Sequence, residues 1–384
     1  MEKWKQYRLI EVLEALIDYR GKTPKKTTYG VPLITAKIIK NGRIEKPTEF
    51  ISVDDYDSWM VRGFPKVGDV VLTTEAPLGE VAQLDDANIA LAQRVVTLRG
   101  KSEILDNTYL KYYLLSHVGQ QRLKARETGT TVTGIKQSEL REVIVDVPPY
   151  EVQVGIAKVL KSLDDKIEVN RRINENLEQQ AQALFKSWLS ECKQEVTISQ
   201  LSENITDYTK CNLDKVVLIN SSDVTEGHFE HHTYSANKNL KGHFKKRFQK
   251  GDILYSQVRP RNRHWGYCTF DAVDYIASTQ LMIIRNRADV ISSILLYQYI
   301  IDDDVWMDFT NKTETRSGTF PQGNYEDLSA IKVRFGADTR KITKDLESIY
   351  FLIYNNEAES RLLAELRDTL LPRLMSGEII INEI

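Results

Sequence analysis

The run EVQVGIAKVLKSLDDKIEVNRRINENLEQQAQALFKSWL at residues 151–189 decides the fold, because it reads as one long amphipathic helix. It contains one glycine and no proline, so nothing in it interrupts helical hydrogen bonding. At 1.5 Å per residue such a helix spans about 57 Å. Its apolar stripe follows alternating steps of four and three residues, the spacing of a coiled-coil seam, and comprises Ile156, Leu160, Leu163, Ile167, Asn170, Asn174, Leu177, Ala181, Leu184 and Trp188.

A second run with similar spacing occupies residues 338–371 and predicts a second long helix. We expect Pro372 to break this helix and Ser376-Gly377 to turn the chain. The stripe of this run comprises Ile342, Leu346, Ile349, Ile353, Asn356, Leu363 and Leu370.

Asn170 and Asn356 interrupt the two apolar stripes at positions 186 residues apart. A seam asparagine costs stability and can fix the register of two helices, although incidental asparagines in ordinary helix packing are the alternative. The first helix carries the chain from one globular half to the other. The second can bury its stripe only by running back along the first. We therefore expect an antiparallel pair with one globular unit at each end and an approximate two-fold axis.

The chain contains an internal repeat with a period of about half its length. Gly68-Asp69-Val70 returns as Gly251-Asp252-Ile253, and Asp18-Tyr19 returns as Asp207-Tyr208. Further matches in the same order are Val31, Leu33, Ile34, Gly42 and Glu45 with Val216, Leu218, Ile219, Gly227 and Glu230, Pro77 with Pro260, and Thr131 and Leu140 with Thr319 and Leu328.

Each half follows the same plan of short β-type runs, a helical stretch, a Gly/Thr/Ser turn and a closing strand. The helical stretches are expected at 107–125 and 292–309, and the turns at 127–134 and 314–323. The predicted fold class is α+β, with two tandem mixed α/β units separated by two long antiparallel helices in a pseudo-two-fold repeat. The expected domains are 1–149, the central helix 150–189, 190–337, and the C-terminal helix with its tail, 338–384.

Composition narrows the class of protein. The 384 residues are 41 % hydrophobic and 28 % charged, which excludes a collagen-like, wholly disordered or membrane-embedded chain. The three cysteines, Cys192, Cys211 and Cys268, are widely spaced and fit a reducing compartment better than a disulfide framework. The start of the chain has no apolar signal core, so we expect a cytoplasmic protein without a membrane segment.

The net charge of −2 conceals two local basic stretches, one in each half. Residues 20–46 hold eight basic side chains and one acid, and residues 238–263 hold nine basic side chains and one acid. A solvated surface is the alternative for either stretch alone. Their occurrence in both halves favours nucleic acid, because lysine and arginine neutralise phosphates and arginine also binds base edges.

Motifs for catalysis are incomplete. GKT at 21–23 and GKS at 100–102 lack the upstream glycine of a phosphate-binding loop. VPPY at 147–150 lacks the side chain that would hold a target amine, so we interpret it as a strand-to-helix corner. His228, His231 and His232 with Cys211 match no metal-site spacing. We find no nucleophile–base signature either, and the sequence therefore indicates a recognition subunit rather than an enzyme.

These runs give the chain a specific resemblance. Residues 147–189 strongly resemble the central region of the specificity subunits of Type I restriction–modification systems, and ESRLLAELRDTLLPRLMSGEI (359–379) resembles their closing region. KVGDVVL (66–72) and KGDILYSQVRP (250–260) are similar to a strand that recurs in their target-recognition domains. The departures are modest: RGKTP (20–24) replaces a GGTP-like turn, and Tyr150 stands where leucine is frequent.

The resemblance implies a non-catalytic subunit that reads a bipartite site in double-stranded DNA, one target-recognition domain per half-site. It implies two modification (methyltransferase) subunits and the restriction (translocase and nuclease) subunits as partners. S-adenosylmethionine, ATP and magnesium would belong to those partners, with no cofactor and no metal bound by this chain. A coiled-coil scaffold that binds only protein is one alternative, and an independent DNA methyltransferase or nuclease is another.

From the basic turns and the Gly/Thr loops we expect DNA contacts by two sets of residues. The first half contributes Lys22, Lys25, Lys26, Lys37, Thr73, Thr74, Thr130, Thr131 and Lys136, and the second Ser221, Ser222, Gln257, Arg259, Arg261, Arg263, Ser317 and Thr319. For partner binding we expect the ends of the long helices, with burial between the helices as the alternative. Those residues are Phe185, Trp188, Leu371, Pro372 and Leu374.

Overall fold

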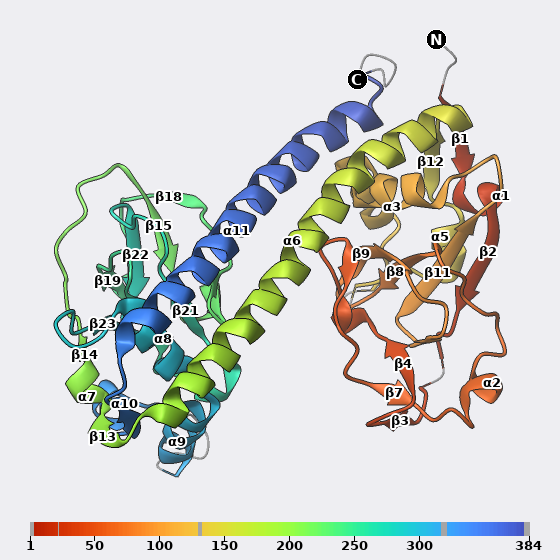
Figure 1. Ribbon diagram of the computed structural model, residues 1–384. Coiled ribbons are helices and arrows are strands. Elements are labelled where there is room, and N and C mark those ends of the chain that lie inside the picture. The colour runs from red at the N-terminus through yellow and green to blue at the C-terminus, as the bar shows by residue number, and fades with distance from the viewer. Residues whose placement is uncertain (1–3, 22, 130–132, 316–320, 380–384) are drawn as a thin grey trace. The chain divides into compact units, whose positions relative to one another are not determined.

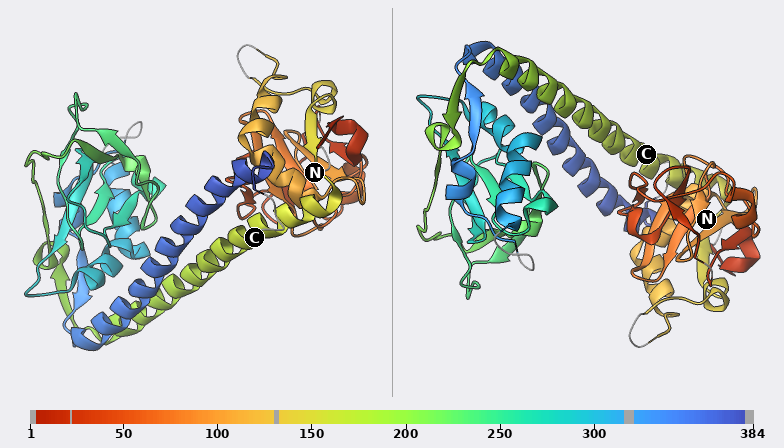
Figure 2. Two further views of the ribbon diagram at one scale, coloured as in Figure 1. Left: turned by 90° about the horizontal axis from the view of Figure 1, so that it is seen from above. Right: turned by 90° about the horizontal axis from the view of Figure 1, so that it is seen from below.

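The computed structural model describes residues 4–21, 23–129, 133–315 and 321–379 (Figures 1 and 2). The chain divides into two compact units: Met1–Val169 with Glu359–Ile384 is the first unit, and Asn170–Ala358 is the second unit. The long helices α6 (Tyr150–Glu191) and α11 (Thr339–Met375) each contribute one part to each unit. The domain boundaries expected from the sequence stay a prediction.

The first unit combines two four-stranded sheets, in the orders β2-β11-β8-β9 and β10-β4-β7-β3, with the pairs β1-β12 and β5-β6. Its strands are β1 (Lys5–Arg8), β2 (Leu13–Asp18), β3 (Lys26–Thr27), β4 (Val31–Ile34), β5 (Ile39–Lys40), β6 (Arg43–Ile44), β7 (Phe50–Ile51), β8 (Val70–Thr74), β9 (Leu78–Gln83), β10 (Ala90–Leu91), β11 (Val95–Gly100) and β12 (Ile144–Val147). Its short helices are α1 (Leu9–Val12), η1 (Ala36–Ile38), α2 (Tyr56–Trp59), α3 (Asn107–Leu115), α4 (His117–Lys124) and α5 (Gln137–Arg141).

The second unit has two corresponding sheets, β14-β23-β20-β21 and β18-β15-β22-β19, with the pairs β13-β24 and β16-β17. Its strands are β13 (Gln194–Thr197), β14 (Ser202–Asn204), β15 (Lys215–Ile219), β16 (Val224–Thr225), β17 (His228–Phe229), β18 (Tyr234–Ala236), β19 (Phe244–Lys246), β20 (Ile253–Ser256), β21 (Trp265–Tyr267), β22 (Tyr275–Ser278), β23 (Leu281–Asn286) and β24 (Lys332–Phe335). Its short helices are α7 (Ile198–Leu201), η2 (Ser221–Asp223), η3 (Pro260–Asn262), α8 (Ser293–Ile301), α9 (Asp303–Glu314) and α10 (Tyr325–Ser329).

The structure confirms the internal repeat, and its aspartates explain why the Gly-Asp dipeptide recurs. Asp69 binds the Arg99 guanidinium through both oxygens, each at 2.7 Å from a nitrogen. Asp252 binds Arg285 in the same way, at 2.6 and 2.7 Å. Both carboxylates are buried, and hydrogen bonding to them raises the pKa of each arginine. Each pair joins the strand that begins beside the aspartate to its neighbour in the sheet.

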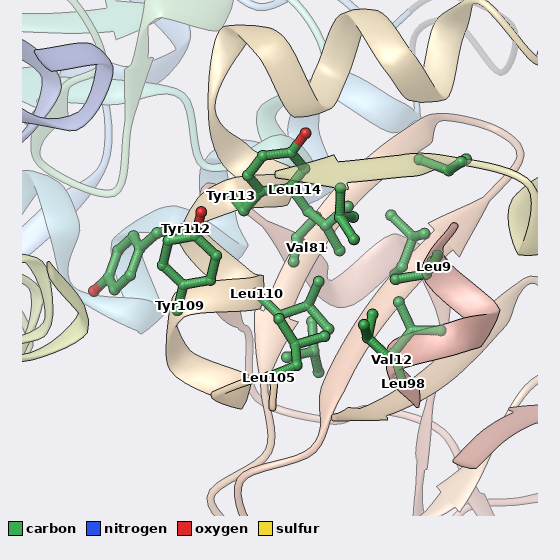
Figure 3. Close-up of a cluster of buried hydrophobic side chains, with 14 of the residues drawn as sticks. Leu9, Val12, Val81, Leu98, Leu105, Tyr109, Leu110, Tyr112, Tyr113 and Leu114 are labelled. Carbon is green, nitrogen blue, oxygen red and sulfur yellow. The ribbon is translucent and has the colours of Figure 1, made fainter. Parts of the chain in front are cut away.

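Figure 3 shows how α3 fills the core of the first unit. Tyr109, Leu110 and Tyr113 belong to one buried cluster with Val81 of the sheet and Val12 of α1 (Figure 3). The tyrosine hydroxyls form hydrogen bonds at the edge of this core. Tyr109, for example, donates to the Asp146 carbonyl at 2.6 Å. Their pKa values are raised, chiefly by burial.

The helical stretches expected at 107–125 and 292–309 are each two helices, which corrects the prediction. Ser116 ends α3 and caps α4, because its hydroxyl accepts from the Gly119 amide at 3.2 Å. Asp302 separates α8 from α9 in the same way, accepting from the Asp304 amide at 3.1 Å. Short polar side chains that bind the backbone favour a new helix start over continuation.

In the first unit, Asp164 ties the two long helices to α3. Its carboxylate on α6 accepts from Lys111 Nζ at 3.0 Å, from the Tyr112 hydroxyl at 2.6 Å and from Arg367 of α11 at 2.9 Å. Burial opposes the charged form of Asp164, but the cations and the hydroxyl prevail and lower its pKa. The half-buried carboxylate of Asp164 is therefore stabilised by partners from α3 and α11.

In the second unit, asparagine side chains join α6 to α11 across the helix pair. Asn356 Nδ2 donates to Asn174 Oδ1 at 2.8 Å, and Asn174 Nδ2 donates to the Ile353 carbonyl at 3.2 Å. Asn170 Nδ2 approaches the Asn356 carbonyl at 3.4 Å. The helices are antiparallel, as expected, and lie side by side within each unit (Figures 1 and 2). The seam asparagines bond between helices, which favours the register interpretation over incidental packing.

Two details of the long helices differ from the sequence-based expectation. Leu184 is exposed and Phe185 is buried in its place, because a straight helix with 3.6 residues per turn drifts from a strict heptad repeat. Pro372 does not end α11, which continues to Met375. The last turn survives because Pro372 still accepts from the Ser376 amide at 3.0 Å, and because Leu374 is buried in the first unit's core. In the described part of the chain, no helix has the length and apolar character that crossing a membrane requires.

His228 on β17 contacts both long helices within the second unit. Its Nδ1 lies 2.7 Å from Glu357 on α11, and its Nε2 lies 3.4 Å from Glu178 on α6. Hydrogen bonds to these two carboxylates raise the pKa of His228 from 6.5 to about 10, although 45 % of the side chain remains exposed. His228 is therefore protonated at neutral pH, and its imidazolium connects the β16-β17 hairpin to α6 and α11.

We expect Asp252→Asn to lower the free energy of unfolding by about 2 to 4 kcal/mol, because Arg285 loses a doubly bonded buried carboxylate. Urea unfolding measures the change. Asp338→Asn is the matched control, because its pair with Arg340 is exposed to solvent and should contribute little to stability. A loss at Asp252 no larger than at Asp338 would contradict the role given to the repeated aspartate.

His228→Gln should flatten the decrease in stability at alkaline pH. The folded pKa of about 10 lies above the ordinary 6.5, so the stabilisation is complete below pH 6.5 and disappears as the pH rises toward 10. Urea unfolding of wild type and variant across that range tests this, with His117→Gln as the control from the first unit. Parallel curves for wild type and His228→Gln would disprove the cluster's contribution.

Candidate nucleic-acid interface

In each unit, the tip of one β-hairpin is held against the Gly/Thr-rich turn. In the second unit, the connection 257–264 between β20 and β21 is called the second tip. Gly323 N donates to the Gln257 carbonyl at 2.8 Å, and Arg259 N donates to the Pro321 carbonyl at 3.0 Å. In the first unit, the connection 75–77 between β8 and β9 is called the first tip. Beside it, Ile135 N, directly after the turn, donates to the carbonyl of Thr74, the last residue of β8, at 2.9 Å.

In both units, therefore, the hairpin tip contacts the Gly/Thr-rich turn, although the side chains of the two tips differ. Bridges between Glu75 and Gly134 and between Val258 and Gln322 occupy corresponding places. The structure thus brings together, in each unit, the hairpin and the turn that the sequence singled out separately. Hydrogen-bond donors and cations in such connections are suited to binding phosphates and base edges.

The second tip has a tightly constrained backbone. Arg259 and Arg263 both adopt left-handed conformations, with φ of 49° and 53°, on either side of η3. Non-glycine residues seldom adopt this backbone conformation, and they keep it only where the surrounding structure restrains them. One such restraint is Trp306 of α9, whose indole nitrogen donates to the Pro260 carbonyl at 3.0 Å.

Arg263 braces this tip from within. Its guanidinium lies 4.1 Å from the ring centroid of Trp306 and 5.7 Å from that of Trp265. It also binds Asp303 at 2.9 Å. A cation held against aromatic rings and paired with a carboxylate is fixed in position. Arg263 therefore supports the tip, and its contact with DNA stays a prediction.

Arg261 and Arg259 present their side chains differently from Arg263. Both are exposed, and 71 % of the Arg261 side chain remains accessible. Arg261 is bound by Glu314, the last residue of α9. Gln257 is half-buried at the base of the tip.

Ser221 and Ser222 belong to η2, which leads into the β16-β17 hairpin. That hairpin joins the second tip through backbone bonds, because Glu226 N donates to the Arg263 carbonyl at 3.0 Å and Gly227 N to the Trp265 carbonyl at 2.9 Å. Ser222 is exposed and Ser221 is half-buried. Their contact with DNA stays a prediction.

Thr73 and Thr74 are buried, which corrects their expected role. The Thr73 hydroxyl accepts from the Glu80 amide at 2.9 Å, and the Thr74 hydroxyl donates to the Arg94 carbonyl at 3.3 Å. Both side chains are at most 1 % exposed. They hold β8 to its neighbours and present no surface to a ligand in this conformation.

The four described lysines of the first unit's predicted set are exposed, but they do not form one cluster. Lys136 directly follows the segment that binds the first tip and precedes α5. Lys26 and Lys37 instead surround Glu49, at 2.8 and 4.0 Å. Lys25 is the neighbour of Lys26 on β3. Lys22, Thr130, Thr131, Ser317 and Thr319 lie outside the described residues.

Arg94, which no sequence pattern singled out, lies beside the first tip. Its Nε is 2.8 Å from Glu75 Oε1. The preceding residue, Gln93, accepts from the Thr23 hydroxyl at 2.9 Å and so connects the basic turn to this place. Arg94 begins the run RVVTLR, and nothing in the sequence separates it from the strand that follows.

Most of the predicted partner-binding set is buried. Phe185 and Trp188 pack around Tyr299, with ring centroids 4.9 and 6.2 Å apart, and Leu374 lies in the first unit's core. Burial, which the sequence left open as the alternative, describes these three side chains. Pro372 is exposed and Leu371 is half-buried. The long helices expose other large apolar side chains instead, foremost Phe351 and Leu352 in the second unit and Leu362 and Leu366 in the first.

Comparisons with known proteins agree with one another. A profile described as "Type I restriction modification DNA specificity domain" matches residues 1–179. The Type I restriction enzyme HindI specificity subunit of Haemophilus influenzae is 34 % identical over 36 % of this chain, a match that spans only 30 % of that subunit. The MjaIX specificity subunit of Methanocaldococcus jannaschii is 23 % identical over 95 % of this chain and 91 % of its own length.

The fold is also similar to a solved structure. The S subunit of a Type I restriction–modification system from M. genitalium superimposes with a TM-score of 0.57 at 16 % sequence identity. That superposition covers 97 % of this chain and 96 % of the other. The similarity therefore includes both units and both long helices.

Proposed function

Because the chain belongs to the family of Type I restriction–modification specificity subunits, we propose that it selects the DNA sequence on which such an enzyme acts. Each unit reads one half of a bipartite site in double-stranded DNA. The long helices, each of which contributes to both units, set the unread gap between the half-sites.

The observation that carries this proposal is the pair of hairpin tips, one per unit, each bonded to its Gly/Thr turn. The first tip carries Glu75 beside Arg94, whereas the second carries Arg259 and Arg261. Different donors and acceptors at corresponding places suit two different half-sequences. A scaffold that binds only protein would not require such exposed charged groups beside the same turn in both units.

Catalysis is assigned to partner subunits. Two modification subunits supply adenine methylation with S-adenosylmethionine, and restriction subunits supply ATP-driven cleavage with magnesium. This chain is the non-catalytic subunit of that assembly and binds no cofactor itself. Its own residues choose and orient the DNA.

The modification subunits dock on the exposed apolar side chains of the long helices. Phe351 is 65 % exposed in the second unit, and Leu362 is 66 % exposed in the first. Large apolar groups on otherwise charged helices are typical of interface anchors. One such position in each unit suits one modification subunit per unit. These residues take the place of the buried Phe185, Trp188 and Leu374.

Mapping of N6-methyladenine in cells that express this chain with its modification subunit should reveal one motif of two short half-sites around an unread gap. Exchange of the second unit for that of another specificity subunit should change one half-site and leave the other intact. DNA binding by the complex should weaken steeply with salt. Uniform methylation, or none above background, would contradict the proposal.

Phe351→Asp and Leu362→Asp should each weaken binding of a modification subunit by about tenfold or more, because a charge replaces an apolar anchor. Co-purification and titration with the partner measure this. Phe351→Leu keeps an apolar side chain and serves as the matched control. Unchanged binding by both aspartate variants, with circular dichroism like the wild type, would remove these residues from the interface.

A further inference from the structure

Arg261 of the second tip is bound by a carboxylate along only one edge of its guanidinium. Nε contacts Glu314 Oε1, and Nη2 donates to Glu314 Oε2 at 2.5 Å. Among the described residues, these are the contacts of the group, so the Nη1–Nη2 edge is open. The side chain is nevertheless fixed in direction, because a doubly bonded guanidinium shares a plane with its carboxylate.

The backbone that carries Arg261 is fixed as well. Pro260, its neighbour, accepts from Trp306 at 3.0 Å, and Arg263 is held by Trp306 and Asp303. Within the tip, the Asn262 amide donates to the Arg259 carbonyl at 2.9 Å. The open edge of Arg261 is therefore presented from a rigid platform, which is what selective recognition needs.

We propose that Arg261 recognises a guanine in the half-site read by the second unit and that Glu314 is its positioning residue; this inference rests on the proposed function. The two N–H groups of the open edge match the O6 and N7 acceptors that guanine presents in the major groove. Glu314 keeps the guanidinium plane in place before DNA arrives, so less side-chain freedom is lost on binding.

The pairing with Glu314 distinguishes a base contact from a phosphate contact. The Arg261–Glu314 pair has no net charge, so it gains little from neutralising a phosphate and releasing counterions. Its open N–H groups still donate to the neutral acceptors of a base. Adenine offers one acceptor and one donor along its major-groove edge, which does not match two donors.

The test uses the full chain in complex with its modification subunit, by methylation mapping and by binding to duplexes that carry the motif or a single changed base. Arg261→Ala should lose selectivity at one guanine of the second half-site. Its affinity for the intact motif should fall about tenfold to a hundredfold, with little change on unrelated duplex. Arg261→Lys should not restore the selectivity, because an ammonium lacks two coplanar donors.

Glu314→Gln should lower discrimination at the same guanine by about tenfold, while binding to unrelated duplex stays equal or rises because a negative charge is lost. Glu195→Gln removes an acid from the exposed Lys332 pair of the same unit and is the matched control. Circular dichroism melting confirms that each variant is folded.

Three results would overturn the inference. One is a second half-site without guanine. Another is an Arg261→Ala variant that loses affinity equally on all sequences with a shallower salt dependence, the signature of a phosphate contact. The third is a Glu314→Gln variant with unchanged discrimination, which would remove the positioning role. A wild-type complex that recognises no split motif would instead refute the proposed function itself.

Discussion

Burial of the apolar stripe on α6 is the constraint on which the rest of the structure depends. A helix of 42 residues leaves such a stripe in water unless a partner covers it, and α11 covers it in both units. The bonds among Asn174, Asn356 and the Ile353 carbonyl select the register, because a slipped pair would bury amides without partners. Asp164 and His228 then connect the pair to α3 in the first unit and to β17 in the second.

The two copies of the repeat share their buried Asp–Arg pair but differ in the residues of their hairpin tips. Asp69 and Asp252 retain the same buried contact with an arginine, since removal of one partner would leave an uncompensated charge in the core. The tips that these sheets carry do not share a sequence. Glu75 stands in one and Arg261 in the other, on connections whose side chains face no such packing constraint. A duplicated scaffold with two independent tips is a direct route to an asymmetric DNA site.

Features that follow from a pattern repeated along the chain could be predicted from the sequence. The exposure of a side chain could not, because it depends on strands that are distant in the sequence. The helix pair and the basic stretch in each half followed from spacing and local charge. Thr73 and Thr74 were expected to contact DNA, but both are buried and bind the backbone of Glu80 and Arg94, which no local sequence pattern indicates. Arg94 was missed because its partner Glu75 lies 19 residues away in the connection between β8 and β9. Phe185 was expected at an interface, whereas helical drift turned it toward Tyr299.

The sequence by itself determined the class of this protein: two copies of one α/β design, two long antiparallel helices and a basic segment in each half. Heptad spacing, the Gly-Asp repeat and local charge are properties of residues near one another in the chain, so they are visible without coordinates. Only the tertiary structure decided which arginine supports the second tip and which arginine is exposed to a ligand. Arg261 and Arg263 are two residues apart, and their difference comes from Glu314, Asp303 and Trp306, which the fold brings to them from α9.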